Sequence, residues 1–436
     1  MSYKKISIFL LNSLTTTFLC ALNPVFAQDA ISDAESERIV SILANDDMEG
    51  RETGTKGNEK AARFIEEEFK KAGLSYMEGM NSYQQSFTLY TTTTQSQSIK
   101  LNKQKFSSNN SFALTDRTYF KTKKVSELNV VEINSGDDFR QKFSEYRAAE
   151  KPTLVLVDTA HSETFQQFSY YFRNTPPKNQ LDDKHFSLWV LTADKKVKKA
   201  KIEIEKSVKE VKVTNIVGVL PGKKSDEKVL FSAHYDHIGI QEPIQGDSIA
   251  NGADDDATGV AAVIQLANHF KKQKNERTLV FVAFDAEEQG LKGSEYFAQQ
   301  VTPETFVAHV NIEMIGKPSD RGVRKAYVTG FEKSNLGAIL KKEAGLHGYT
   351  FFKDPYTSYN LFMRSDNASM AKLGVPAHTV SSDPIDFDSY YHTVNDEIET
   401  LNFKNMTDVI RAISIGVTPI INGEATPSRI DYESRK

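Results

Sequence analysis

Histidine and acidic side chains gather in five short segments of the second half of the chain. Several of these segments directly follow short apolar runs that predict β-strands, and open α/β sheets bind their ligands beyond the carboxyl ends of the strands. A single histidine or aspartate in a loop is usually a cap or a solvated group. Five such segments together predict one shared site. They cover residues 231–237, 252–256, 284–290, 311–314 and 390–393.

The residue types in these segments indicate metal binding. Glu287 and Glu288 follow an apolar strand and would repel each other unless a cation or a raised pKa relieved the repulsion. Zinc accepts imidazole nitrogen and carboxylate oxygen, and a catalytic zinc keeps one position open for water. The only cysteine, Cys20, lies in the N-terminal apolar segment. Any metal site of the mature chain must therefore be built from His, Asp and Glu.

The elements that must position these residues alternate between strand and helix from residue 213 onward. This order is typical of an α/β domain with a largely parallel sheet. Apolar runs predict the strands, and amphipathic spacing predicts the helices. Strands are expected at 215–220, 228–233, 277–284, 309–314, 326–329 and 376–380, and helices at 258–272, 294–301, 333–344 and 406–420.

The first half of the chain has a different texture. Residues 31–74 predict two amphipathic helices on either side of a glycine-containing loop at 50–54. Residues 76–212 are polar with short strand-like runs, which favours an inserted β-rich accessory region over a disordered linker. A protease-associated-like domain is one candidate for it. The expected plan is a signal peptide (1–27), N-terminal helices (28–75), the insertion (76–212), the site-bearing domain (213–425) and a tail (426–436).

Composition and the N-terminus indicate an exported protein without a nucleic acid partner. The 436 residues carry a net charge of -4 with basic and acidic residues interspersed, so no electrostatic footprint for nucleic acid is present. Lys4 and Lys5 precede an apolar run that ends in Val25-Phe26-Ala27, the pattern of a cleaved secretory signal. Polar residues interrupt the run, and no lipoprotein box precedes the cysteine. We expect a periplasmic or secreted protein with no stable membrane anchor, and the sequence leaves its oligomeric state open.

The five segments together resemble the M28 family of cocatalytic dizinc peptidases, which includes aminopeptidases. The similarity covers the loop Met48-Glu49-Gly50-Arg51, the adjoining residues 53–57 and nearly all of 213–401. It implies a mixed, largely parallel central sheet flanked by helices, as in zinc exopeptidases and phosphorylase/hydrolase-like proteins. It also implies peptide substrates and two Zn²⁺ ions.

The resemblance assigns the metal ligands residue by residue. Asp255 would bridge both ions, because Asp255-Asp256-Ala257-Thr258-Gly259 matches the family pattern at that position. His234 and Glu313 would complete one zinc site, and Glu288 and His392 the other. Glu313 departs from the family, which usually has an aspartate there, so its ligand arm is longer by one methylene.

The resemblance also assigns catalytic roles. Glu287 corresponds to the general base, which takes a proton from the attacking water and delivers it to the leaving amine. Asp236 corresponds to the carboxylate that holds the imidazole of His234 in its ligating tautomer. Asp366 is expected to have a supporting role. Three further histidines, His237, His309 and His378, are interpreted as structural or surface residues.

The favoured function is removal of N-terminal residues from peptides by an exported zinc aminopeptidase. A carboxypeptidase or dipeptidase of the same family is one alternative, for which Arg364 is the basic residue near the late loops. A glutaminyl cyclase with one zinc is a second, and a binding ectodomain is the least favoured, because every ligand is retained. The sequence does not choose the oxyanion-stabilising residue; the candidates are Tyr359, Tyr390 and Tyr391.

Overall fold

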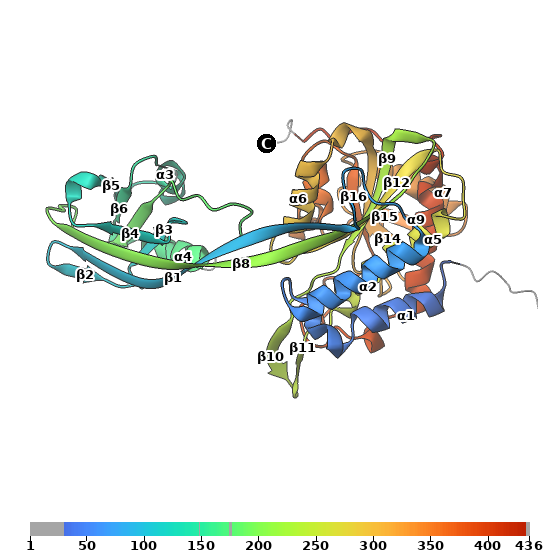
Figure 1. The fold of residues 1–436 in the computed structure, drawn as a ribbon, viewed down its shortest axis with the longest axis horizontal. Coiled ribbons are helices and arrows are strands. Elements are labelled where there is room, and N and C mark those ends of the chain that lie inside the picture. The colour runs from blue at the N-terminus through green and yellow to red at the C-terminus, as the bar shows by residue number, and fades with distance from the viewer. Residues whose placement is uncertain (1–29, 148, 174–176, 433–436) are drawn as a thin grey trace, which may run out of the picture.

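The computed structural model describes residues 30–147, 149–173 and 177–432, which form two bodies of unequal size (Figure 1). The larger body contains the N-terminal helices and the whole second half of the chain. A two-stranded antiparallel ribbon extends from it and carries the smaller body, the accessory lobe. The predicted signal peptide, residues 1–27, lies outside the described residues.

A ten-stranded mixed sheet runs through the larger body and continues into the ribbon, in the order β15-β14-β16-β13-β9-β12-β8-β1-β2, with β4 also paired to β8. The central neighbours β16, β13, β9 and β12 are parallel to one another. The expected α/β fold with a largely parallel sheet is therefore confirmed. Its strands are β9 (Lys224–His234), β12 (Arg277–Phe284), β13 (Phe306–Ile312), β14 (Lys325–Val328), β15 (Thr350–Lys353) and β16 (Ala377–Ser381).

Helices cover both faces of this sheet because alternate residues of the central strands are apolar on both sides. Phe231 and Phe281 face the layer formed by the larger helices, whereas Leu230 and Val282 face a smaller layer. The first layer comprises α1 (Asp33–Leu43), α2 (Lys56–Ala72), α5 (Thr258–Phe270), α7 (Leu336–Gly345) and α9 (Phe403–Ile421); the second comprises α6 (Lys292–Gln300) and α8 (Asn367–Ala371).

The ribbon is made by two unusually long strands, β1 (Gln84–Leu101) and β8 (Ala200–Leu220). They pair in antiparallel register from Gln84 opposite Ile216 to Leu101 opposite Ala200, with one irregularity after Thr94. The sequence analysis placed a strand only at 215–220 and a boundary at 212. The structure instead shows one continuous strand across that boundary. Its first part was missed because the middle of the ribbon is rich in exposed Thr, Lys and Glu and lacks the apolar run of a buried strand.

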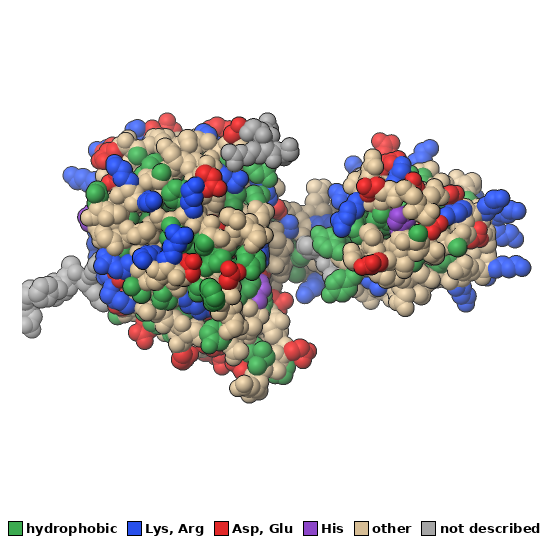
Figure 2. Space-filling model, turned by 180° about the vertical axis from the view of Figure 1, so that it is seen from behind, with side chains coloured by type: hydrophobic (Ala, Val, Ile, Leu, Met, Phe, Trp, Pro, Cys, Tyr) green, Lys and Arg blue, Asp and Glu red, His purple; other side chains and the backbone are tan. Residues whose placement is uncertain are grey.

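The accessory lobe is an α/β unit and not only a β-rich one. Its four-stranded sheet has the order β3-β7-β6-β5, with β5, β6 and β7 parallel. Trp189 and Phe165 are fully buried in its own core, which packs separately from the larger body. Figure 2 shows basic side chains at its distal end. Its elements are β2 (Gln104–Phe106), β3 (Ser111–Leu114), β4 (Tyr119–Thr122), β5 (Asn129–Ile133), α3 (Phe139–Tyr146), β6 (Thr153–Val157), α4 (Ser162–Arg173) and β7 (Ser187–Leu191).

Several short elements were also not predicted from the sequence. The hairpin of β10 (Ile240–Ile244) and β11 (Asp247–Ile249) projects from the larger body, and β15 has only four residues. Such segments are too short to show a periodicity. No helix in the described part of the chain is both long and apolar enough to cross a membrane.

Arg51 joins the N-terminal helices to the edge of the sheet. Its side chain is fully buried, and its guanidinium donates to the carbonyl oxygens of Tyr235 at 2.7 Å, Leu43 at 2.7 Å, Asn251 at 2.5 Å and Gly252 at 3.0 Å. One side chain therefore satisfies buried main-chain acceptors from three segments that are distant in sequence. Burial lowers the pKa of this guanidinium from its ordinary value, although nearby aspartates oppose the shift.

Replacing Arg51 by methionine should lower the free energy of unfolding by about 3 kcal/mol or more, because several buried carbonyl groups lose their donor. Chemical denaturation followed by circular dichroism measures this loss. Arg63→Met is the matched control, since the exposed Arg63 makes only a 3.7 Å pair with Glu59. A loss for Arg51→Met no larger than for the control would contradict the role assigned to Arg51.

His309 and His378 are structural residues inside the larger body. His378 contacts the Ser334 hydroxyl at 2.7 Å and the Thr329 carbonyl oxygen at 2.8 Å through its two ring nitrogens, and burial lowers its pKa to about 4. Burial also lowers the pKa of His309 to about 3. Both side chains are thus held neutral.

The neutral His378 makes stability depend on pH. The unfolded chain binds a proton at this residue below about pH 6.5 and the folded chain only near pH 4, so acid favours unfolding over this window. The stability of the native protein relative to His378→Gln should fall by about 1.4 kcal/mol per pH unit between about pH 6 and 4.5. Denaturation curves at stepped pH values test this. The exposed His347→Gln should show no such pH-dependent difference.

Candidate functional site

Three neighbouring parallel strands of the central sheet (Figure 1), β12, β9 and β13, bring four of the predicted residues together at their carboxyl ends. His234 is the last residue of β9 and lies opposite Phe284, the last residue of β12, in the parallel register. Glu287 and Glu288 follow β12, and Glu313 follows β13, which pairs with the other side of β9. Since the carboxyl ends of adjacent parallel strands meet, these side chains converge although up to 79 residues separate them.

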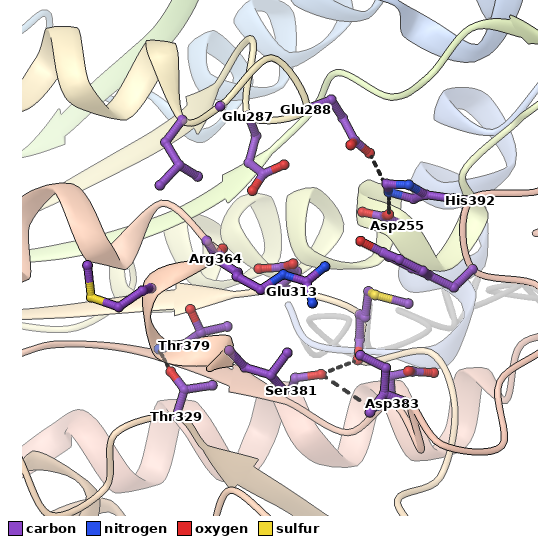
Figure 3. Close-up of a pocket in the computed structure, with 18 of the residues that line it drawn as sticks. Asp255, Glu287, Glu288, Glu313, Thr329, Arg364, Thr379, Ser381, Asp383 and His392 are labelled. Carbon is purple, nitrogen blue, oxygen red and sulfur yellow. Dashed lines mark hydrogen bonds and ion pairs between the residues drawn. The ribbon is translucent and has the colours of Figure 1, made fainter. Parts of the chain in front are cut away.

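Asp255 and His392 reach the same place from two loops. Asp255 lies in the turn of Ala253–Ala257 that leads into α5, and His392 lies in the segment after β16. Asp255 Oδ1 lies 3.1 Å from His234 Nε2, while Asp255 Oδ2 lies 3.3 Å from His392 Nε2. His392 Nε2 is also 3.1 Å from Glu288 Oε1 (Figure 3). The two oxygens of Asp255 therefore face two different histidines.

Several buried donor atoms of this group lack a hydrogen-bond partner. His234 Nε2 and Glu313 Oε2 are buried, and neither makes a hydrogen bond within the described part of the chain. Buried polar atoms are normally satisfied, and a group of orphaned nitrogen and oxygen atoms is what a metal ion fills. The donor set of imidazole and carboxylate suits zinc. The residues present thus fit a metal site built from His, Asp and Glu.

His237 belongs to this site, although the sequence analysis treated it as structural or surface. Its side chain is fully buried, and Nδ1 lies 3.1 Å from Glu288 Oε1 and 3.7 Å from Asp255 Oδ2. His237, Asp255 and Glu288 form a group whose ligand atoms all lie within 4.8 Å of one another. The interpretation as a structural or surface residue is therefore corrected. The available signal was the spacing His234-x-x-His237 directly after a strand.

The carboxylates at this edge shift one another's pKa. Burial raises the pKa of Glu287 well above its ordinary value, and the nearby Glu313, Asp366 and Glu288 add to the effect. Burial likewise raises the pKa of Glu313 to about 7 and that of Asp366 to about 6. Such a concentration of buried carboxyl groups needs either bound protons or bound cations.

The pKa of Asp255 is shifted in the opposite direction from the pKa values of Glu287 and Glu313. Burial alone would raise its pKa, but the contacts from His234 and His392 outweigh that effect and hold the pKa well below the usual range. Asp255 is therefore the carboxyl group of the cluster that stays charged most readily. A charged oxygen pair between two histidines suits the bridging position that the resemblance implies.

The carboxylate of Asp236 accepts hydrogen bonds from main-chain amides just after β12 and makes no direct hydrogen bond with the ring of His234. Its Oδ1 accepts from the Glu287 amide at 3.0 Å, and its Oδ2 accepts from the Glu288 amide at 3.2 Å. His234 Nδ1 contacts the main-chain carbonyl oxygen of Asp236 at 3.1 Å, whereas the carboxylate lies 3.8 Å away. The tautomer of His234 is thus fixed by the Asp236 backbone, and the side chain orients the two glutamates.

Two further buried aspartates hold the turn that carries Asp255. Asp396 accepts from the amides of Asp254 and Asp255 at 3.1 and 3.0 Å. Asp256 accepts from the amides of Gly259 at 3.0 Å and Met314 at 3.1 Å, which ties the turn to the end of β13. The metal-binding side chains thus stand on a frame of buried main-chain hydrogen bonds.

A cavity of about 470 Å³ opens beside this group (Figure 3). Glu287 and Glu313 line it together with Arg364, whose side chain projects toward Glu313 in the figure. Tyr391 lines it as well and stacks on His392 at 3.9 Å between ring centroids. Of the three tyrosines considered from the sequence, Tyr391 is the one that lines this cavity. The hydroxyl of Tyr359 instead donates to Asp386.

Comparison with solved structures identifies the fold. A zinc aminopeptidase from Bacillus subtilis superposes with a TM-score of 0.56 at 15% identity, over 90% of this chain and 95% of that one. The glutaminyl cyclase of Porphyromonas gingivalis gives a TM-score of 0.51 at 13% identity, over 90% of this chain and 100% of that one. At these identities the likeness concerns the fold alone.

Comparison of sequences finds relatives of the second half of the chain. Leucine aminopeptidase 1 of Pyrenophora teres f. teres is 30% identical over 273 residues, which are 57% of this chain and 65% of that protein. The chain thus spans less than two thirds of the length of this relative. The model of peptidase family M28 matches residues 215–415, which include His234, Asp255, Glu288, Glu313 and His392. Over these residues the chain is similar to peptidase family M28.

Proposed function

We propose that the chain is a dizinc aminopeptidase that removes N-terminal residues from peptides. The observation that carries this proposal is the arrangement around Asp255, whose two oxygens face His234 on one side and His392 on the other. Glu313 would complete the first zinc site, and Glu288 the second. The similarity to leucine aminopeptidases supports cleavage at a free N-terminus.

The chain's own residues account for proton movement. Bound zinc would polarise the scissile carbonyl group and lower the pKa of water to near 7. Glu287 faces the cavity and is placed to take the proton of the attacking water. It then delivers that proton to the leaving amine. Tyr391 is placed to donate a hydrogen bond to the oxyanion that forms on the substrate.

A carboxypeptidase or dipeptidase is the second candidate, and the position of Arg364 favours it. This residue lines the cavity, and a guanidinium binds a substrate carboxylate in a bidentate manner. We also propose that the protein acts outside the cytoplasm, on the pattern of its N-terminal segment.

Substrate panels separate these candidates. The purified mature protein should contain two zinc ions per chain and should cleave chromogenic substrates with a free α-amino group but not their N-blocked analogues. Elemental analysis and initial rates measure both properties. Cleavage of N-blocked peptides with a free C-terminus would favour the carboxypeptidase. A single zinc with no peptide cleavage would reject both candidates.

Glu287→Gln should lower kcat by about 10²–10⁴ while leaving the zinc content at the native value, because the amide cannot accept the proton. Asp255→Asn should lose both activity and zinc, because it removes the charge shared by the two sites. Rate and metal content are measured on the same preparations. The exposed Glu304→Gln serves as the control for both variants. A Glu287→Gln enzyme with near-native kcat would remove Glu287 from the reaction.

A further inference from the structure

His237 has a geometry that the five-ligand assignment does not use. Two oxygens, Glu288 Oε1 and Asp255 Oδ2, lie between two imidazole nitrogens, His237 Nδ1 and His392 Nε2. The distances to Glu288 Oε1 are 3.1 Å from each nitrogen, and the distances to Asp255 Oδ2 are 3.7 and 3.3 Å. His237 therefore approaches the same two oxygens as the assigned ligand His392.

The fold holds the ring of His237 in this place. Its side chain is fully buried, and the backbone of Gly252 packs against the ring: a Cβ atom at Gly252 would lie 2.6 Å from Cδ2 of His237. Gly252 also has a φ of 57°, which favours glycine. Because Gly252 has no side chain, the turn that carries Asp255 can pack directly against the ring of His237.

The separations match those of donors around one metal ion. Zinc bonds to nitrogen and oxygen of about 2.0–2.1 Å in a tetrahedral arrangement place the donor atoms about 3.3 Å apart. The four measured separations scatter around that value.

We propose that His237 is a ligand of the second zinc ion, together with His392, Glu288 and the bridging Asp255. This inference rests on the proposed dizinc function and deepens it. Four protein donors fill a tetrahedral zinc site, as in closed sites, whereas a catalytic zinc keeps a position open for water. The open position then belongs to the first site, that of His234 and Glu313. Figure 3 shows Glu287 projecting into the cavity that Glu313 also lines.

Two substitutions at residue 237 distinguish a ligand from a hydrogen-bond donor. In His237→Asn the amide nitrogen takes the place of Nδ1 and can still donate to Glu288, but it is a poor zinc ligand. His237→Ala removes both functions. The exposed His347→Asn is the matched control for loss of a histidine. Each full-length mature protein is equilibrated in buffers of stepped free zinc, and bound zinc per chain is measured by elemental analysis.

The native protein and His347→Asn should bind two zinc ions per chain. His237→Asn and His237→Ala should both bind the second ion about 100-fold more weakly, with the first ion retained. Replacement of zinc by cobalt adds a second readout. The visible absorption of the cobalt-loaded protein should be weaker in both variants than in the native protein.

Other outcomes overturn the inference in separate ways. Native affinity in His237→Asn with weakened binding in His237→Ala would make His237 a positioning residue that only donates to Glu288. Native affinity in both variants would remove it from the site altogether. Absence of zinc from the native protein would instead reject the dizinc function itself, so the two failures are distinguishable.

Discussion

Mutual repulsion among buried carboxylates is the constraint on which the site depends. Asp255, Glu287, Glu288 and Glu313 meet at one edge of the sheet, and burial penalises the charge on each of them. Such a group is stable only with cations or protons bound, because several unpaired charges cannot stay buried together. Together with burial, the same repulsion raises the pKa of Glu287, so that its carboxylate can act as a base beside the proposed metal site.

A second set of buried polar residues makes this crowding geometrically possible. Arg51, Asp236 and Asp396 do not bind metal; each is occupied by main-chain groups of the segments that carry the ligands. These hydrogen bonds fix the backbone positions of the segments that carry the proposed ligands. The pattern is that of a site supported by an outer shell of hydrogen bonds. Arg51 belongs to the segment 48–57, which lies far from the proposed ligands in sequence but contacts the main chain of the segments that carry them.

The accessory lobe is joined to the larger body mainly through the two-stranded ribbon. It has its own apolar core around Trp189 and its own parallel sheet. Strands β1 and β8 begin in the central sheet, so the insertion extends that sheet and does not interrupt it. The residues of the metal site come from the other, parallel side of the sheet.

The sequence by itself determined the α/β order of the second half, the buried strand at 277–284 and the residues Asp255, Glu287, Glu288, Glu313, His234 and His392 as one group. The strand and helix order follows from apolar runs and helical spacing, and the charged residues after several of these runs predict a shared site, whereas the choice of these six residues rests on the resemblance to the M28 family. Only the tertiary structure decided the contacts of His237, the partners of Asp236 and the continuous strand β8. Each of these depends on contacts between distant segments, such as Gly252 against His237 or β1 against β8, and a local pattern carries no information about which distant segment supplies the partner.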